Sequence, residues 1–245
     1  MIAIILAGGY AKRLWPLTLD KPKALLPVAG KPIIDYVLKK ILKINPPVRK
    51  IIVSTNLRFQ PQFEEWLETR GYDDVELVPD SSRNECDKIG AVKALSNIAS
   101  AISEEFLVLA GDNLFLDELN GFVQFFNEKH SPVVALYHAR NLDEAKKSAT
   151  VILNDNGRIM DFIEKPENPK TTQVGVCLYA FPSRIGMSLK DYVALGLPQD
   201  EPGKFIEWLH KVEPVYGYML NSYLLDIGTL ESYKEAENSI KRLSK

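Results

Sequence analysis

The chain has 245 residues, of which 46% are hydrophobic and 25% charged, and its formal net charge is −2. These values are those of an ordinary soluble globular protein, and α/β chains of this length commonly form one domain. The near-neutral charge argues against a nucleic-acid-binding protein, which usually carries a strongly basic face. No apolar run approaches membrane-spanning length, and the N-terminus lacks a secretory signal pattern. We therefore expect a cytoplasmic chain that binds neither nucleic acid nor a membrane.

Strands and helices alternate in the first half of the sequence. Short apolar runs rich in β-branched residues predict strands, and apolar residues at helical spacing predict helices. The expected strands are residues 2–6, 50–54, 75–79, 106–110 and 133–138, and the expected helices are residues 32–44, 59–70, 89–102 and 117–129. This alternation indicates a mostly parallel, Rossmann-like α/β sheet flanked by helices. Such a sheet binds its ligands at the carboxyl ends of its strands.

The pattern changes after about residue 147. Asn156-Gly157 separates two extended segments and predicts a β-hairpin. A strand at 173–181, helices near 183–195 and 203–211, strand-like segments at 214–220 and 223–227, and a terminal helix at about 229–243 follow. No linker rich in Pro, Gly or Ser separates the two halves. We therefore expect a single domain over residues 1–245.

A glycine-containing loop follows the first expected strand. It consists of Leu6, Ala7, Gly8 and Gly9. Lys12, Arg13, Lys21 and Lys23 come next, and Asp20 is the only acidic residue among them. Accessible backbone donors beside clustered cations suit a polyphosphate, although the glycines alone are equally consistent with a simple turn. The glycine motifs of dinucleotide-binding proteins and of P-loop ATPases are both absent.

Taken whole, this segment resembles the signature of sugar-phosphate nucleotidylyltransferases, roughly L-A-G-G-x-G-T-R-L-x-P-L-T followed by P-K-x-L-L-P-V. The match covers residues 6–9, 13–14, 16–18 and 22–28, whereas Ala11 and Lys12 replace the usual Gly-Thr. The resemblance extends over almost the whole chain, as far as Tyr233. It implies that the chain converts a nucleoside triphosphate and a sugar 1-phosphate into a nucleotide sugar and pyrophosphate. By this resemblance Arg13 holds the leaving pyrophosphate, and Lys23 holds the phosphates near the reacting centre.

Two aspartates, Asp112 in AGDNLF and Asp226 in LLDIGTLESY, each end an apolar run. A strand-terminal aspartate is often only the cap of the next helix. Magnesium, however, prefers one or two carboxylates together with phosphate oxygens. The two positions resemble the metal-binding aspartates of the family, which implies that both hold Mg²⁺ and that Asp112 also belongs to the nucleotide site. Leu224 and Leu230 stand where the family usually has an aromatic residue and a proline.

The expected hairpin ends in Glu164-Lys165-Pro166, which by itself could be a polar strand end. It resembles the E-K-P motif of the family, whose glutamate contacts sugar hydroxyls and whose lysine contacts the sugar phosphate. Gln173 and Gly175 stand where the family often shows N-x-G, so the resemblance adds both to the sugar site. Residues 148–245 are therefore expected to bind the sugar phosphate, and residues 1–147 to bind the nucleotide.

The segment KIGAVKAL, residues 88–95, is a degraded form of the family motif that packs under the nucleobase. Its Gly90 is assigned to the nucleotide site, although the segment could equally be the start of an amphipathic helix. The preceding loop, DSSRNECDK, is longer and more charged than the family pattern predicts. The preferred substrates are dTTP and glucose 1-phosphate. A uridylyl- or cytidylyltransferase and a non-catalytic nucleotide-sugar sensor remain as alternatives, and a homo-oligomer is left open.

Overall fold

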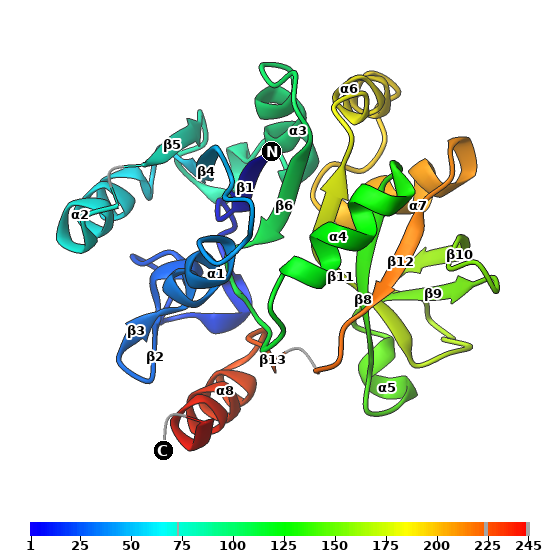
Figure 1. The fold of residues 1–245 in the computed structure, drawn as a ribbon. Coiled ribbons are helices and arrows are strands. Elements are labelled where there is room, and N and C mark those ends of the chain that lie inside the picture. Colours follow the sequence, from blue (N-terminus) through cyan, green and yellow to red (C-terminus); the bar gives the residue numbers. More distant parts are fainter. Residues whose placement is uncertain (73, 223–224, 244–245) are drawn as a thin grey trace. The chain divides into compact units, whose positions relative to one another are not determined.

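The computed structural model describes residues 1–72, 74–222 and 225–243 (Figure 1). The chain divides into two compact units, each discontinuous in sequence. Unit 1 consists of Met1, Gly90–Val108 and Asp117–Tyr223, and unit 2 of Ile2–Ile89, Leu109–Leu116 and Leu224–Lys245. Both units therefore contain residues from either side of position 147.

Unit 2 is built on three parallel strands, β1 (Ile2–Leu6), β4 (Lys50–Asn56) and β5 (Val75–Asp80). Ile2 pairs with Lys50, and Ile51 pairs with Val75. The side chains of β1 from Ile2 to Ile5 are buried, as expected for a parallel strand covered on both faces. The helices α1 (Ile33–Ile41) and α2 (Gln60–Arg70) lie between these strands in the sequence. The predicted alternation of strand and helix is thus confirmed.

Unit 2 also contains several short elements and the terminal helix. They are the 3₁₀ turns η1 (Lys12–Leu14), η2 (Lys23–Leu25) and η3 (Glu85–Asp87), the strand pairs β2 (Pro27–Val28) with β3 (Lys31–Pro32) and β7 (Asn113–Leu114) with β13 (Leu225–Asp226), and the helix α8 (Leu230–Leu243). One buried apolar cluster joins Leu14, Leu26, Val28, Ile33, Leu114, Ile227, Ala236 and Ile240. The terminal helix, β7 and the loop after β1 are therefore packed on a shared core.

Unit 1 contains a largely antiparallel sheet. Its strands are β8 (Val133–His138), β9 (Ala149–Leu153), β10 (Ile159–Glu164), β11 (Gln173–Phe181) and β12 (Tyr216–Met219). β11 pairs antiparallel with β8 and β9, β9 forms the predicted hairpin with β10, and β12 runs parallel to β8. β6 (Phe106–Ala110), whose residues belong partly to each unit, neighbours β11.

Among its described residues, unit 1 has the helices α3 (Ala91–Ala99), α4 (Asn120–Lys129), α5 (Leu142–Ala145), α6 (Ile185–Ala194) and α7 (Pro202–Val212). α7 begins with Pro202, which suits the first helical position because its missing N–H has no partner there anyway. It buries Phe205, Ile206 and Leu209 and packs against β10 (Figure 1). This packing places the first turn of α7 beside the end of the hairpin.

The predicted α/β class, with parallel strands, flanking helices and a C-terminal hairpin, is confirmed. Within the strand expected at 223–227, Tyr223 and Leu224 lie outside the described residues. None of the described helices is both long enough and apolar enough to cross a membrane.

Candidate functional site

The backbone of the glycine loop in unit 2 is fixed by the end of β4. Ala7 N–H donates to the Ser54 carbonyl (2.8 Å), and the Asn56 side-chain amide donates to the Gly8 carbonyl (2.9 Å). Asn56 is fully buried, so its side-chain amide is not accessible to a ligand and serves to hold the loop. A Cβ on Gly9 would have no atom within 4 Å. The loop is therefore anchored on one side and open at Gly9, as an anion-binding backbone requires.

Ala11 explains how the chain tolerates the loss of a glycine from the family signature. Its φ of 43° and ψ of 47° lie in the left-handed region, which glycine adopts readily and alanine only at a cost. The Ala11 carbonyl accepts hydrogen bonds from Leu14 N–H and Thr18 Oγ1, both at 2.9 Å, which hold this conformation. The turn η1 follows and carries Arg13, which is exposed and has no side-chain partner among the described residues.

Lys23 and Asp112 are brought into direct contact. The distance from Lys23 Nζ to Asp112 Oδ2 is 2.7 Å, and the Lys23 side chain is only 12% exposed. The loop that carries Asp112 is tied to the end of β1, because Gly111 N–H donates to the Leu6 carbonyl (2.9 Å). Two predicted site residues from distant parts of the sequence therefore meet beside the glycine loop.

The backbone also brings the second predicted metal ligand to the same place. β13 pairs antiparallel with β7, and Asp226 lies opposite Asn113, the neighbour of Asp112. Leu114 of β7 and Ile227, which directly follows β13, share the buried apolar cluster and hold this pairing together. The register thus places the backbone of Asp226 opposite the residue that follows Asp112.

The Glu164 carboxylate of unit 1 is largely buried against the start of α7. Burial raises the pKa of its carboxyl to about 7, although the neighbouring Lys165 ammonium acts to lower it. A Cβ on Gly203 would lie 1.7 Å from Glu164 Oε2, so only glycine leaves room for the carboxylate at this position. Glu164 N–H donates to Glu207 Oε2 (3.0 Å), and Glu207 also accepts from Lys204 (2.9 Å).

Lys165 leaves the end of β10 with a positive φ of 49°. Its backbone N–H donates to the Ser148 carbonyl (3.2 Å), and its ammonium forms an ion pair with Glu201. Glu201 is the N-cap residue of α7 but makes no side-chain cap, because its carboxylate reaches Lys165 instead. The lysine predicted to bind the sugar phosphate is therefore held by a carboxylate in this structure.

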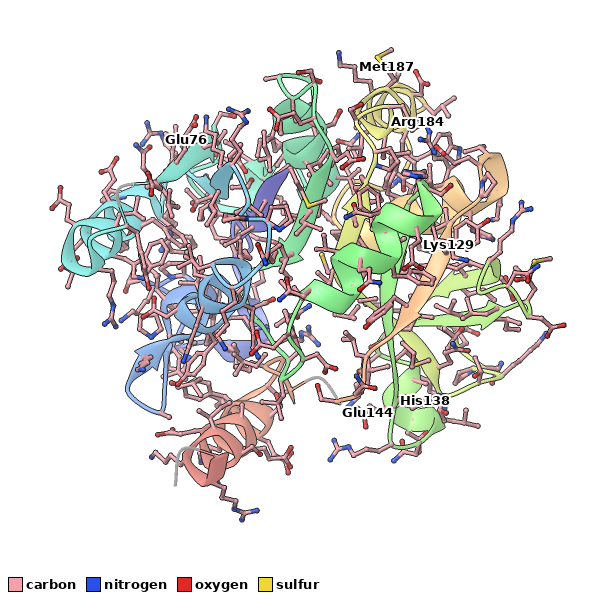
Figure 2. All side chains as sticks on the ribbon, viewed as in Figure 1. Glu76, Lys129, His138, Glu144, Arg184 and Met187 are labelled. Carbon is pink, nitrogen blue, oxygen red and sulfur yellow. The ribbon has the colours of Figure 1, made fainter. Side chains whose placement is uncertain are left out.

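Gln173 and Gly175 lie at the start of β11. Gln173 pairs with His138 of β8, which is labelled in Figure 2, and Gly175 pairs with Leu136 and Ala149. A Cβ on Gly175 would lie 3.1 Å from the ring of Phe162, two residues before Glu164. Gly175 thus leaves room for the ring of Phe162, which comes from β10, the strand that ends in Glu164.

Gly90 also lies in unit 1, at the N-cap of α3. Its φ of 88° is disfavoured for other residues, and a Cβ would lie 2.6 Å from the carbonyl oxygen of Gln199. The same carbonyl accepts a hydrogen bond from Val92 N–H (2.8 Å). The segment between α6 and α7, which contains Gln199 and Glu201, therefore contacts Gly90 and Lys165 alike.

The predicted residues form two groups. Unit 2 holds Leu6, Ala7, Gly8, Gly9, Arg13, Lys23, Asp112 and Asp226, and unit 1 holds Gly90, Glu164, Lys165, Gln173 and Gly175. Sequence reasoning missed the supporting residues Asn56, Glu201 and Gly203, and also Glu85, whose carboxylate pairs with Lys12 beside Arg13. Asn56 at the carboxyl end of a predicted strand and Gly203 after a helix-starting proline were visible signals. Nothing local pointed to Glu85 or Glu201, because their partners lie far away in the sequence.

Comparison with known proteins agrees with this geometry. The family described as nucleotidyl transferase matches residues 2–242. The chain belongs to this family. It is 28% identical over 243 residues to the UTP–glucose-1-phosphate uridylyltransferase AglF of Haloferax volcanii, and the match covers 98% of this chain and 97% of the relative.

Two further proteins show the range of the similarity. The bifunctional protein GlmU of Methanocaldococcus jannaschii is 28% identical over 228 residues, which are 93% of this chain but 51% of that protein. The chain thus spans about half the length of this relative. A crystal structure from Bacillus anthracis, assigned as a glucose-1-phosphate thymidylyltransferase in complex with a sucrose, superposes with a TM-score of 0.82 at 23% identity. That match covers 98% of this chain and 95% of the other, and it shows the shared fold.

Proposed function

We propose that this nucleotidyl transferase makes a nucleotide sugar and pyrophosphate from a nucleoside triphosphate and a sugar 1-phosphate. The observation that carries the proposal is the contact of Lys23 with Asp112 beside the anchored glycine loop. A phosphate oxygen of the sugar 1-phosphate attacks the α-phosphorus of the triphosphate in line. The bond from the α-phosphorus to the bridging oxygen breaks, and pyrophosphate leaves with that oxygen.

The attacking oxygen is already an anion, so the reaction needs no general base. Its main barrier is the repulsion between two polyanions, about 4 kcal/mol for two unit charges 4 Å apart at an effective dielectric constant near 20. Positioned cations and backbone donors must therefore supply most of the catalysis. Arg13 is proposed to hold the pyrophosphate as it leaves, Lys23 the phosphates at the reacting centre, and Lys165 the sugar phosphate.

We propose Asp112, just before β7, and Asp226, in β13, as magnesium ligands, because carboxylate oxygens suit Mg²⁺. Asp112 provides a partly exposed carboxylate, and the strand pairing places Asp226 beside its neighbour Asn113. Mg²⁺ usually takes one or two carboxylates and completes its shell with phosphate oxygens and water. When bound there, it would neutralise charge on the phosphates of both substrates. Asp112 would then have two functions, as a metal ligand and as the carboxylate that holds Lys23 in place.

We propose glucose 1-phosphate as the sugar phosphate and a pyrimidine nucleoside triphosphate as its partner. dTTP is the nucleotide expected from the sequence, and the name of the Haloferax volcanii relative supports UTP. Glu164, Gln173 and Gly175 are the residues proposed to face the sugar, and Gly90 the residue proposed to lie under the base.

Pyrophosphate exchange tests the proposal directly. The protein is incubated with magnesium, pyrophosphate and a panel of nucleotide sugars that includes dTDP-glucose and UDP-glucose, and formation of the triphosphate is followed. We expect exchange with at least one of them, and we expect Asp112→Asn and Lys165→Ala to lose most of it. A protein that binds nucleotide sugars but catalyses no exchange across the panel is a sensor instead.

A further inference from the structure

The segment Asp80–Lys88 of unit 2, here called the acidic loop, is longer and more charged than the family resemblance leads us to expect. It follows β5 and contains three carboxylates, Asp80, Glu85 and Asp87, against two cations, Arg83 and Lys88. Another departure is Lys12, which stands where the signature after the first strand has threonine. The structure shows that these two departures meet.

The acidic loop has a defined conformation of its own. Asn84 and Asp87 form a reciprocal capping box around η3, in which Asn84 Oδ1 accepts from Cys86 N–H (3.0 Å) and Asp87 Oδ1 accepts from Asn84 N–H (2.9 Å). Asp87 Oδ1 also accepts from Arg83 N–H (3.1 Å). The Glu85 side chain takes no part in this capping. Its carboxylate can therefore be changed while the bonds that shape the loop remain.

Two contacts join the acidic loop to Tyr10 and Lys12, which follow the glycine loop. Tyr10 Oη donates to Ser82 Oγ (3.4 Å), and Ser82 is fixed in turn by Asp80 Oδ1, which accepts from Ser82 N–H (2.7 Å). The second contact is an ion pair between the Lys12 ammonium and Glu85 Oε2. Lys88 approaches the other oxygen of the same carboxylate (3.3 Å).

The ion pair is accessible to a competing anion. The Lys12 side chain is 53% exposed and the Glu85 side chain 28%, so water reaches both groups. Exposed ion pairs are weak, because water and salt screen them. A triphosphate carries several negative charges, where Glu85 carries one, and it would attract Lys12 more strongly.

We propose that Glu85 is a removable counter-ion of the glycine loop: it occupies Lys12 in the free protein, and the triphosphate of the bound nucleotide displaces it and takes Lys12 as an additional phosphate ligand. This inference rests on the proposed function. Glu85 then lowers the affinity for the nucleotide, because energy is needed to separate the Glu85 carboxylate from the Lys12 ammonium before the triphosphate can bind Lys12. Lys12 stands next to Arg13 on the same turn, so the two cations would hold neighbouring parts of the phosphate chain.

The test measures binding of inorganic tripolyphosphate by titration calorimetry, with magnesium-dTTP and magnesium-UTP as second probes. The variants are Glu85→Gln, Lys12→Ala and the double variant Lys12→Ala/Glu85→Gln. Glu76→Gln is the matched control, because Glu76 of β5 also pairs with an exposed lysine, Lys50, and carries the same charge (Figure 2). Circular dichroism and urea unfolding establish that each variant is folded.

We expect Glu85→Gln to bind tripolyphosphate about two- to fivefold more tightly than the wild type, the range that an exposed ion pair provides. Lys12→Ala should bind tripolyphosphate more weakly than the wild type. When Glu85→Gln is added to Lys12→Ala, the affinity should change by less than a factor of about 1.5, since the ion pair between Lys12 and Glu85 is already gone. The tightening should shrink at high salt. Glu76→Gln should leave the affinity within the same factor of about 1.5.

Other outcomes overturn the inference. Unchanged or weaker binding by Glu85→Gln would show that Glu85 does not compete with the phosphates. Equal tightening in Glu76→Gln, or in the Lys12→Ala background, would show an effect of net charge alone. The proposed function is judged separately by pyrophosphate exchange of the wild-type protein, so exchange without tightening rejects the counter-ion role and leaves the enzyme assignment intact.

Discussion

Glu164 makes a quantitative prediction about stability. The pKa of its buried carboxyl is raised from an ordinary 4.5 to about 7. Between these values the folded protein keeps a proton that the unfolded chain has already released. The unfolded state therefore binds fewer protons, and the free energy of unfolding falls as the pH rises through this interval. The interval spans about 2.5 pH units at about 1.4 kcal/mol each, so Glu164 destabilises the fold by about 3 kcal/mol above pH 7.

Replacing the carboxyl by an amide removes this dependence. Glu164→Gln cannot ionise, so its stability relative to the wild type should increase by about 3 kcal/mol between pH 4.5 and pH 8. Urea unfolding of both proteins at several pH values measures the difference, with the slope against urea as a check that the extent of unfolding is the same. Glu76→Gln, in which an exposed carboxylate is lost, measures the general effect of one charge.

Parallel stability curves for the wild type and Glu164→Gln would refute the reasoning. In that case the Glu164 carboxylate would be as well stabilised when ionised as it is in water, and the neighbouring ammonium of Lys165 would have to compensate fully for burial. A difference of the opposite sign would mean that the pKa is lowered rather than raised.

Four further substitutions, at three positions, test the backbone and the packing around the candidate site. Gly90→Ala should destabilise the protein by about 2–4 kcal/mol in urea unfolding, because it combines a positive φ with a Cβ placed 2.6 Å from the Gln199 carbonyl oxygen. Ala11→Gly should be tolerated without loss of stability, whereas Ala11→Val should cost about 1–3 kcal/mol, because a β-branched residue fits the left-handed region poorly. Gly203→Ala should push the Glu164 carboxylate from its place and reduce kcat/KM for the sugar 1-phosphate by about 10- to 100-fold, while calorimetry finds magnesium-dTTP binding unchanged. Normal turnover by Gly203→Ala would show that catalysis does not depend on the position of the Glu164 carboxylate.

Local signals in the sequence predicted most of the elements. The run QVGVCLYAF forms a strand with the predicted bounds, because its apolar residues are buried within a sheet. The hairpin follows from Asn156-Gly157, where Gly157 adopts a φ of 77° that suits the turn. The helix predicted at residues 203–211 extends over Pro202–Val212. In each case the pattern within one short segment determines the structure.

The supporting contacts of the candidate site could not be predicted in this way. The ion pairs of Lys12 with Glu85 and of Lys165 with Glu201 join residues from different elements, and neither partner carries a local pattern that names the other. The two-residue strand β13, with Asp226, is too short to show periodicity, and its partner β7 lies far away in the sequence. Such pairings are decided by tertiary packing, here by the apolar cluster that holds Ile227 in place.

The ion pairs also bear on how the proposed site would select its ligands. Lys23 and Lys165 each lie against a carboxylate, Asp112 and Glu201, whereas Arg13 has no side-chain partner in the described part of the chain. A phosphate that binds Arg13 displaces only water. A ligand that takes Lys165 must replace the Glu201 carboxylate, and a neutral hydroxyl offers too little attraction to do so. A dianionic phosphate can, because its charge more than replaces the one that leaves. On the proposed function, Glu201 would therefore favour sugar phosphates over free sugars without touching the sugar ring.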